Sequence, residues 1–230
     1  MRRLLAALLP LLALITAPAR AEVTVYETVE VQEFIVESGS ERLVEAVLPA
    51  PKPGGIAAYG PFRVLDSSRA ALVDVTDHTA PGQFAAMLRD YPGILMLEMI
   101  ECPGTDDDRA NLRLGRMIHA RGIATHVPAG GSVRSGGVEL FLAGARRLAD
   151  PGAEFAVHAW ADGDGREPSD YAADAPENRA YLDYYREMGM SSSQAANFYA
   201  MTNSVPNADA KWMGAEDMAR WVKLDQARIP

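Results

Sequence analysis

The stretch between residues 80 and 158 repeats one alternation, from a short apolar run to an amphipathic stretch of helical period. The apolar runs cover 94–100, 123–127 and 154–158, and the helical stretches cover 80–90, the segment from 106–108 to about 121, and 135–148. Strands and helices that alternate through short connections form parallel sheets with right-handed crossovers. The sequence therefore predicts an α/β fold with a mostly parallel sheet and helices packed around it.

The segments on either side of this alternation are less regular. Before it, the sequence predicts a half-buried strand within 22–36, a loop at 47–60 and a hairpin at 62–75 that turns around Asp66. After it, we expect a polar loop at 161–177, helices at about 178–189 and 191–201, and a short helix near 214–222. The length after residue 21 suits a single domain, 22–230, in which 22–60 form an N-terminal strand and loop extension.

The first 21 residues have the layout of a secretory signal peptide. Arg2 and Arg3 precede an apolar stretch, and Ala19-Arg20-Ala21 provides a small-x-small cleavage site. A membrane anchor is the alternative, but the apolar stretch is short for a spanning helix of about 20 residues and Pro10 interrupts it. We expect cleavage after Ala21 and a periplasmic or secreted protein with no membrane span after cleavage.

Charge and cysteine content exclude several functions. The chain has a net charge of −9, which becomes more negative when the three arginines of the signal are removed, so nucleic acid is not an expected partner. Cys102 is the only cysteine, so no intrachain disulfide forms, and a small buried residue at a strand end is its expected role. No Cys or His cluster has metal-ligand spacing, and we expect no metal and no cofactor.

Ser135 follows a glycine-rich turn and begins a predicted helix. Gly136 and Gly137 allow a substrate to approach the backbone closely, and the helix N-terminus favours an oxyanion. The same position equally suits a serine that only caps the helix. Arg134, directly before it, would favour an acidic substrate if its side chain were exposed.

A serine nucleophile needs a base within hydrogen-bond reach. His158 ends the apolar run that follows the Ser135 helix. In a parallel sheet, functional side chains collect at the carboxyl ends of strands, so the turns after 94–100 and 123–127 are expected to share one edge with His158. A partly buried histidine at a strand end, without a catalytic role, is the alternative interpretation.

Three segments of the chain, within residues 94–160, resemble the Clp protease/crotonase-like superfamily. LEMIECPGTDD resembles the family's apolar strand before Pro-Gly-Gly, VRSGGVELFLAGARR its nucleophile segment, and DPGAEFAVHAW its histidine segment. The similarity is to the Clp protease proteolytic subunit and signal peptide peptidase A, and closest to exported bacterial members known as predicted periplasmic proteins. It implies a fold of repeated β-β-α units, and self-association is plausible because related folds assemble into rings or trimers.

The resemblance also implies roles for individual residues. Ser135 matches the nucleophile and His158 the general base, while the Gly136 N–H matches one oxyanion donor. Gly104 keeps the first glycine of Pro-Gly-Gly, and Thr105 stands where the family has the second, whose N–H is the other donor. The β-branched side chain of Thr105 restricts the backbone there.

The third member of a catalytic triad has no clear match. The position of the family acid falls near Pro206 or Asn207, neither of which is acidic. Asp209 is close by, and Asn207 or Asn203 could orient the imidazole through a hydrogen bond. Some relatives use a Ser-Lys pair, but none of the three lysines, Lys52, Lys211 and Lys223, is at a matching position.

These observations favour a periplasmic serine hydrolase, a peptidase with a Ser135–His158 dyad or incomplete triad, acting on a peptide or protein substrate. A catalytically weak or inactive protein of this fold that serves as a binding or assembly module is the alternative. A crotonase-like enzyme of acyl thioesters is a third interpretation, disfavoured because coenzyme A is not expected outside the cytoplasm. The acids at 106–108 could bind a cation, although a solvated helix N-terminus explains them.

Overall fold

The computed structural model describes residues 51–225, which all belong to one compact unit of the chain. The predicted signal peptide and its cleavage site, the strand within 22–36 and the beginning of the 47–60 loop lie outside the described residues. No helix within 51–225 is long and apolar enough to cross a membrane.

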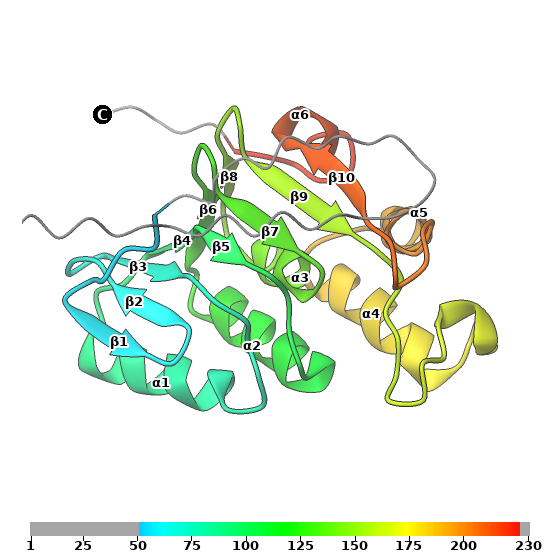
Figure 1. Cartoon of the computed structure of the whole chain (residues 1–230), viewed down its shortest axis with the longest axis horizontal. Coiled ribbons are helices and arrows are strands. Elements are labelled where there is room, and N and C mark those ends of the chain that lie inside the picture. Colours follow the sequence, from blue (N-terminus) through cyan, green and yellow to red (C-terminus); the bar gives the residue numbers. More distant parts are fainter. Residues whose placement is uncertain (1–50, 226–230) are drawn as a thin grey trace, which may run out of the picture. The chain divides into compact units, whose positions relative to one another are not determined.

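Two sheets organise the described chain (Figure 1). The six-stranded sheet has the order β1-β2-β3-β4-β6-β8, and the four-stranded sheet has the order β10-β9-β7-β5. Strands β3, β4, β6 and β8 run parallel, as do β5, β7 and β9, whereas β1, β2 and β10 pair in antiparallel fashion. The strands of the first sheet are Ala57–Tyr59, Phe62–Val64, Arg69–Leu72, Met96–Met99, Ala124–Val127 and Arg147–Ala149, and those of the second, from β5, are Glu101–Cys102, Ser132–Arg134, Glu154–Val157 and Lys211–Gly214.

The parallel part is built from β-β-α units, β4-β5-α2 and β6-β7-α3, followed by the strand pair β8-β9. In each unit the chain leaves the first sheet and enters the second. Residue Ile100 shows how: its N–H donates to the Leu72 carbonyl in the first sheet, and its carbonyl accepts from the Ser132 N–H in the second. The predicted mixed α/β architecture with a mostly parallel sheet is confirmed.

The helices are α1 (Ala80–Asp90), α2 (Asp108–Ala120), α3 (Gly136–Leu142), α4 (Pro176–Glu187), α5 (Ser192–Thr202) and α6 (Ala215–Met218), with a 3₁₀ turn at Pro168–Asp170. The predicted helices at 80–90, 178–189 and 191–201 correspond closely to α1, α4 and α5. Helix α2 begins at an N-cap, Asp107, whose carboxylate accepts from the Ala110 N–H. The acids at 106–108 therefore lie at a helix N-terminus, which was one of the two interpretations of them; the other was a cation site.

Several short strands differ from the sequence prediction. The run 94–100 was expected to be one strand, but β4 covers only Met96–Met99, and β5 begins at Glu101 because Ile100 bonds to both sheets. The 135–148 stretch was expected to be helical throughout, yet α3 ends at Leu142 and β8 follows. Gly144 explains the tight turn between them: a Cβ there would lie 2.2 Å from Thr125 Oγ1. Strands β1, β7 and β10 fall in segments that the sequence predicted as loop, turn and irregular tail.

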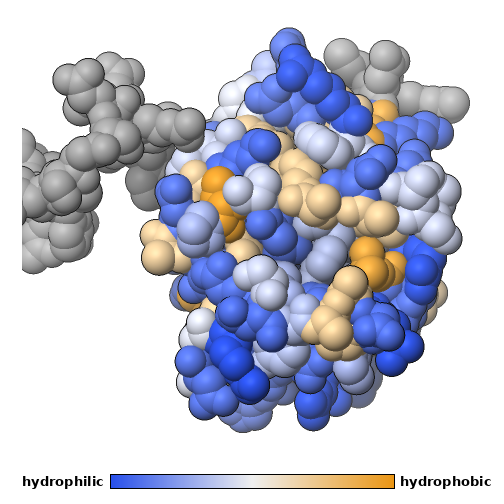
Figure 2. Space-filling model, turned by 90° about the vertical axis from the view of Figure 1, so that its right-hand side faces the viewer, coloured by the Kyte–Doolittle hydropathy of each residue, from blue (hydrophilic) through white to orange (hydrophobic). Residues whose placement is uncertain are grey.

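The core contains the apolar faces that the helical and strand periodicities predict. Phe84 of α1, Leu114 of α2 and Phe141 of α3 are fully buried, as are Leu97 and Phe155 of the two sheets. Cys102 is buried at the end of β5, as expected. The face seen in Figure 2 is mostly hydrophilic, and its strongly hydrophobic residues lie in separate spots.

Candidate active site

The carboxyl ends of three adjacent strands, β5, β7 and β9, meet at one cavity of about 180 Å³. Gly104 and Thr105 follow β5, Ser135 follows β7, and His158 follows β9. The residues that line the cavity come from all three strand ends and from α2, α3, α4 and the segment after α5: Thr105, Asp108, Ser135, Gly136, Glu139, Val157, His158, Trp160, Ala161, Tyr181, Tyr185, Thr202, Asn203 and Asn207. The turns after 94–100 and 123–127 thus meet His158 at one edge, as expected, but the strands that lead into it are β5, β7 and β9, because β7 forms within the second turn.

Ser135 holds a backbone conformation that side chains rarely adopt. Its φ of 49° and ψ of −127° make it the one non-glycine residue with positive φ in the described part of the chain. It occupies the N-cap position of α3, but its side chain makes no capping hydrogen bond to the described residues. Such a conformation costs roughly 1–3 kcal/mol, which the surrounding structure must offset. The helix cap therefore does not account for the serine.

The His158 imidazole is held at its Nδ1 atom. Nδ1 lies 2.8 Å from the Ala159 carbonyl oxygen, and because that oxygen can only accept, Nδ1 carries the proton. The Asn207 Nδ2 amide donates to the same carbonyl at 2.9 Å and lies 3.2 Å from Nδ1. In the neutral imidazole this arrangement makes Nε2 the acceptor, as a general base requires. No hydrogen bond joins His158 to Ser135 within the described residues.

Gly104, Thr105 and Gly136 form the wall beside the serine. Gly104 has a φ of +136°, and a Cβ there would lie 3.1 Å from Ser135 Cβ and 3.5 Å from its Oγ. A Cβ at Gly136 would lie 2.6 Å from Thr105 Cγ2. The backbone N–H groups of Thr105 and Gly136 donate to no acceptor within residues 51–225. Two backbone donors without an acceptor in the described residues thus lie beside Ser135.

A buried hydrogen-bonded pair connects the two sides of this wall. Asn111 of α2 donates from Nδ2 to the Gly136 carbonyl at 2.7 Å, and its Oδ1 lies 3.1 Å from the Thr76 hydroxyl. The Thr76 N–H donates to the Gly104 carbonyl at 3.1 Å, and its carbonyl accepts from the Thr105 hydroxyl at 3.0 Å. Both Asn111 and Thr76 are about 1% exposed, so this pair fixes the spacing between the two N–H donors.

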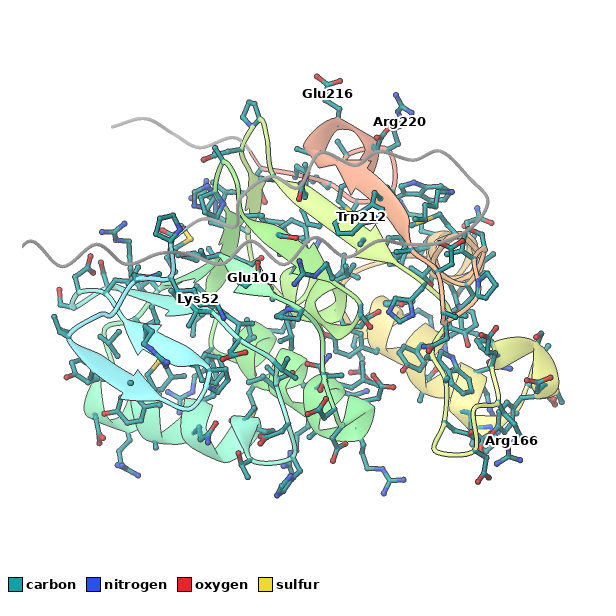
Figure 3. The ribbon with its side chains drawn as sticks, viewed as in Figure 1. Lys52, Glu101, Arg166, Trp212, Glu216 and Arg220 are labelled. Carbon is teal, nitrogen blue, oxygen red and sulfur yellow. The ribbon has the colours of Figure 1, made fainter. Side chains whose placement is uncertain are left out.

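Other residues proposed from the sequence make no hydrogen bond to Ser135 or His158 within the described residues. Asp209 does not line the cavity, and its Oδ1 accepts from the neighbouring Ala210 N–H, so the structure does not bring it to His158. Asn203 does line the cavity, but its amide donates to the Tyr199 carbonyl. Arg134 forms an ion pair with Glu101 of β5, which Figure 3 labels, and does not line the cavity. The expectation that Arg134 selects an acidic substrate is therefore wrong for this cavity.

The sequence analysis missed two acids of the cavity. Glu139 of α3 is 7% exposed, and burial raises its pKa to about 7. Asp108, the first residue of α2, lines the same cavity, and burial raises its pKa while a hydrogen bond with the Tyr181 hydroxyl opposes that shift. The spacing of Glu139 four residues after Ser135, on the same helix face, is the signal that could have identified it.

Comparison with known proteins finds a likeness in structure alone. No family model matches the chain, and no curated protein matches it. A mutant of ClpP1 from Listeria monocytogenes is 15% identical with a TM-score of 0.45, over 68% of this chain and 88% of that one. A mutant of the 1510-N membrane-bound stomatin-specific protease in complex with a substrate peptide is 12% identical with a TM-score of 0.42, over 67% and 75%. A second mutant of that protease is 13% identical with a TM-score of 0.43, over 69% and 79%.

Proposed function

We propose that the protein is a periplasmic serine hydrolase, a peptidase that uses Ser135 as nucleophile and His158 as general base. The observation that carries the proposal is the meeting of Ser135, His158 and two N–H donors at the ends of adjacent strands, around one cavity. The strained backbone of Ser135 supports it, because strain of this kind persists where the surrounding structure imposes it, and it clusters at active sites.

The chemistry follows from these positions. Ser135 Oγ attacks the carbonyl carbon of the scissile bond while His158 Nε2 takes its proton. The negative charge that develops on the carbonyl oxygen is stabilised by the N–H groups of Thr105 and Gly136. His158 returns the proton to the leaving amine, and then activates a water molecule that hydrolyses the acyl-enzyme. The Ala159 carbonyl, which accepts from Nδ1–H, takes the orienting role that an acid has in a triad.

A fluorophosphonate probe tests the nucleophile directly, because it reacts with activated serines. We expect the wild-type protein to be labelled, Ser135→Ala to be unlabelled, and Ser193→Ala, at an exposed position in α5, to be labelled like the wild type. His158→Ala is expected to slow labelling by about 10³- to 10⁴-fold or more, because an unassisted hydroxyl is a weak nucleophile. The readout is the rate of covalent mass gain.

A folded wild-type protein that gains no mass would refute serine chemistry. Labelling that persists in Ser135→Ala would move the nucleophile to another residue. Circular dichroism of each variant distinguishes a lost nucleophile from a lost fold.

A binding or assembly module is the second candidate. Its support is the lack of a hydrogen bond between Ser135 and His158 in the described structure, together with Thr105 in place of a glycine. Hydrogen bonds of this kind are often long before substrate binds, and for this reason we place the hydrolase first. Full function of His158→Ala in cells would favour the module.

A further inference from the structure

The cavity beside Ser135 is lined by two acidic side chains. Glu139 from α3 and Asp108 from α2 both line it, and no lysine or arginine is among its described lining residues. Two carboxylates without a cationic partner are an unusual lining for a site that only has to hold peptide carbonyls, whose oxygens carry negative partial charge. The charge pattern therefore indicates a ligand group of opposite sign.

Glu139 holds a buried carboxylate with few hydrogen-bond donors. Oε1 accepts a hydrogen bond of 2.7 Å from the hydroxyl of Tyr185, the backbone N–H of Glu139 itself also bonds the carboxylate, and no other donor reaches it within residues 51–225. The residue is 7% exposed and lines the cavity. A cation that reaches such a carboxylate stabilises it strongly, because water is largely excluded.

The cavity walls next to these acids are aromatic. Trp160 and Tyr181 stack with ring centroids 6.0 Å apart and planes 7° from parallel, and Tyr185 lies beside Glu139. All three residues line the cavity. Aromatic faces pack against the methylene chain of a long side chain, and they also attract its cationic end.

We propose that this cavity is the subsite for the side chain of the residue whose carbonyl Ser135 attacks, and that it takes a basic side chain of the lysine class. The inference rests on the proposed function, because it places the subsite next to the reacting carbonyl. Trp160 and Tyr181 hold the methylenes, while Glu139 and Asp108 bind the ammonium group. The volume of about 180 Å³ has room for roughly six water molecules, which suits one long side chain.

Two matched phosphonate diphenyl esters test the subsite, one with a lysine side chain and one with norleucine, which keeps the chain and lacks the ammonium group. Ser135 Oγ attacks phosphorus in both, phenoxide leaves, and His158 holds the proton. We expect the wild type to react at least tenfold faster with the lysine ester. Glu139→Gln and Asp108→Asn should each reduce that ratio at least threefold, whereas Asp183→Asn, on the exposed side of α4, should keep it.

The possible outcomes distinguish a failure of the proposed subsite from a failure of the proposed nucleophile. Equal labelling by both esters overturns the subsite while leaving the serine hydrolase intact. If neither ester nor a fluorophosphonate reacts, the hydrolase fails, and the subsite is decided by calorimetry with Ser135→Ala. That variant should bind N-acetyl-lysine amide at least tenfold more tightly than N-acetyl-norleucine amide, and equal affinities overturn the proposal. Asp108→Asn keeps the test decisive if Glu139→Gln does not fold, because Asp108 is more accessible to solvent than Glu139.

Discussion

A carboxyl group that is buried but not ion-paired makes stability depend on pH, and Glu139 is such a group. Its pKa of about 7 lies well above the usual 4.5, so ionisation opposes folding. Below pH 4.5 the group is protonated in the folded and unfolded states and contributes no penalty. Between pH 4.5 and 7 the penalty grows, and above pH 7 it reaches about 3 kcal/mol.

Glu139→Gln should therefore remove this dependence. We expect the free energy of unfolding of the wild type, relative to the variant, to fall by about 2–3 kcal/mol between pH 4.5 and pH 8. Urea denaturation at the two pH values measures it. Glu177→Gln, at an exposed position in α4, should show no such change relative to the wild type. If the free energies of unfolding of the wild type and Glu139→Gln differ by the same amount at pH 4.5 and pH 8, Glu139 ionises normally.

At the residue scale the sequence predicted Ser135, His158 and Asn207 as residues of one site. Ser135 and His158 lie within segments that resemble the family's, and Asn207 falls near the position of the family acid. It could not predict Glu139 or Asp108 as partners in the cavity. Both have ordinary explanations in the sequence, as a charged residue early in a helix and as an acidic helix N-terminus. Their proximity arises only when α2 and α3 pack beside the strand ends.

Two helical glycines differ in how closely other elements pack against them. A Cβ at Gly115 of α2 would lie 2.0 Å from Tyr184 Oη, and this hydroxyl donates to the Glu139 carbonyl at 2.6 Å. A Cβ at Gly82 of α1 would meet nothing within 4 Å. We expect Gly115→Ala to lower the free energy of unfolding by about 1–3 kcal/mol, because Tyr184 is fully buried and must move.

Gly82→Ala is the matched control, and it should raise the free energy of unfolding by up to about 1 kcal/mol through helix propensity alone. Thermal or urea denaturation measures both variants. Equal free energies of unfolding for Gly115→Ala and Gly82→Ala would contradict the close contact between α2 and α4.

Element prediction succeeded where periodicity extends over several turns, as in α1, α2, α4 and α5. It failed for β7, β8 and β10, which have three or four residues each. Such short segments contain too few alternations to separate a strand from a turn, and their pairing with β9 or β6 is a long-range property. Trp212, at 40% exposed, lies in one of these short strands, the edge strand β10 (Figure 3).

For the molecule as a whole, the proposed export from the cytoplasm depends on residues outside the described structure. We propose that the first 21 residues direct export and are removed after Ala21. Expression of the full chain in a bacterium, followed by intact-mass measurement of the osmotic-shock fraction, should give a protein that begins at Glu22. Ala19→Arg with Ala21→Arg should block processing, because the cleavage site requires small residues. Retention of the full-length mass by the wild-type protein would contradict the proposal.

The left-handed backbone at Ser135 has a consequence for how such a chain evolves. Glycine adopts this conformation without strain, so a Ser135→Gly change would remove a local penalty. Selection for fold maintenance alone would therefore permit glycine at this position, and mutational drift would reach it easily, since most proteins are near a stability threshold. A serine held there at a thermodynamic disadvantage points to selection on the hydroxyl itself.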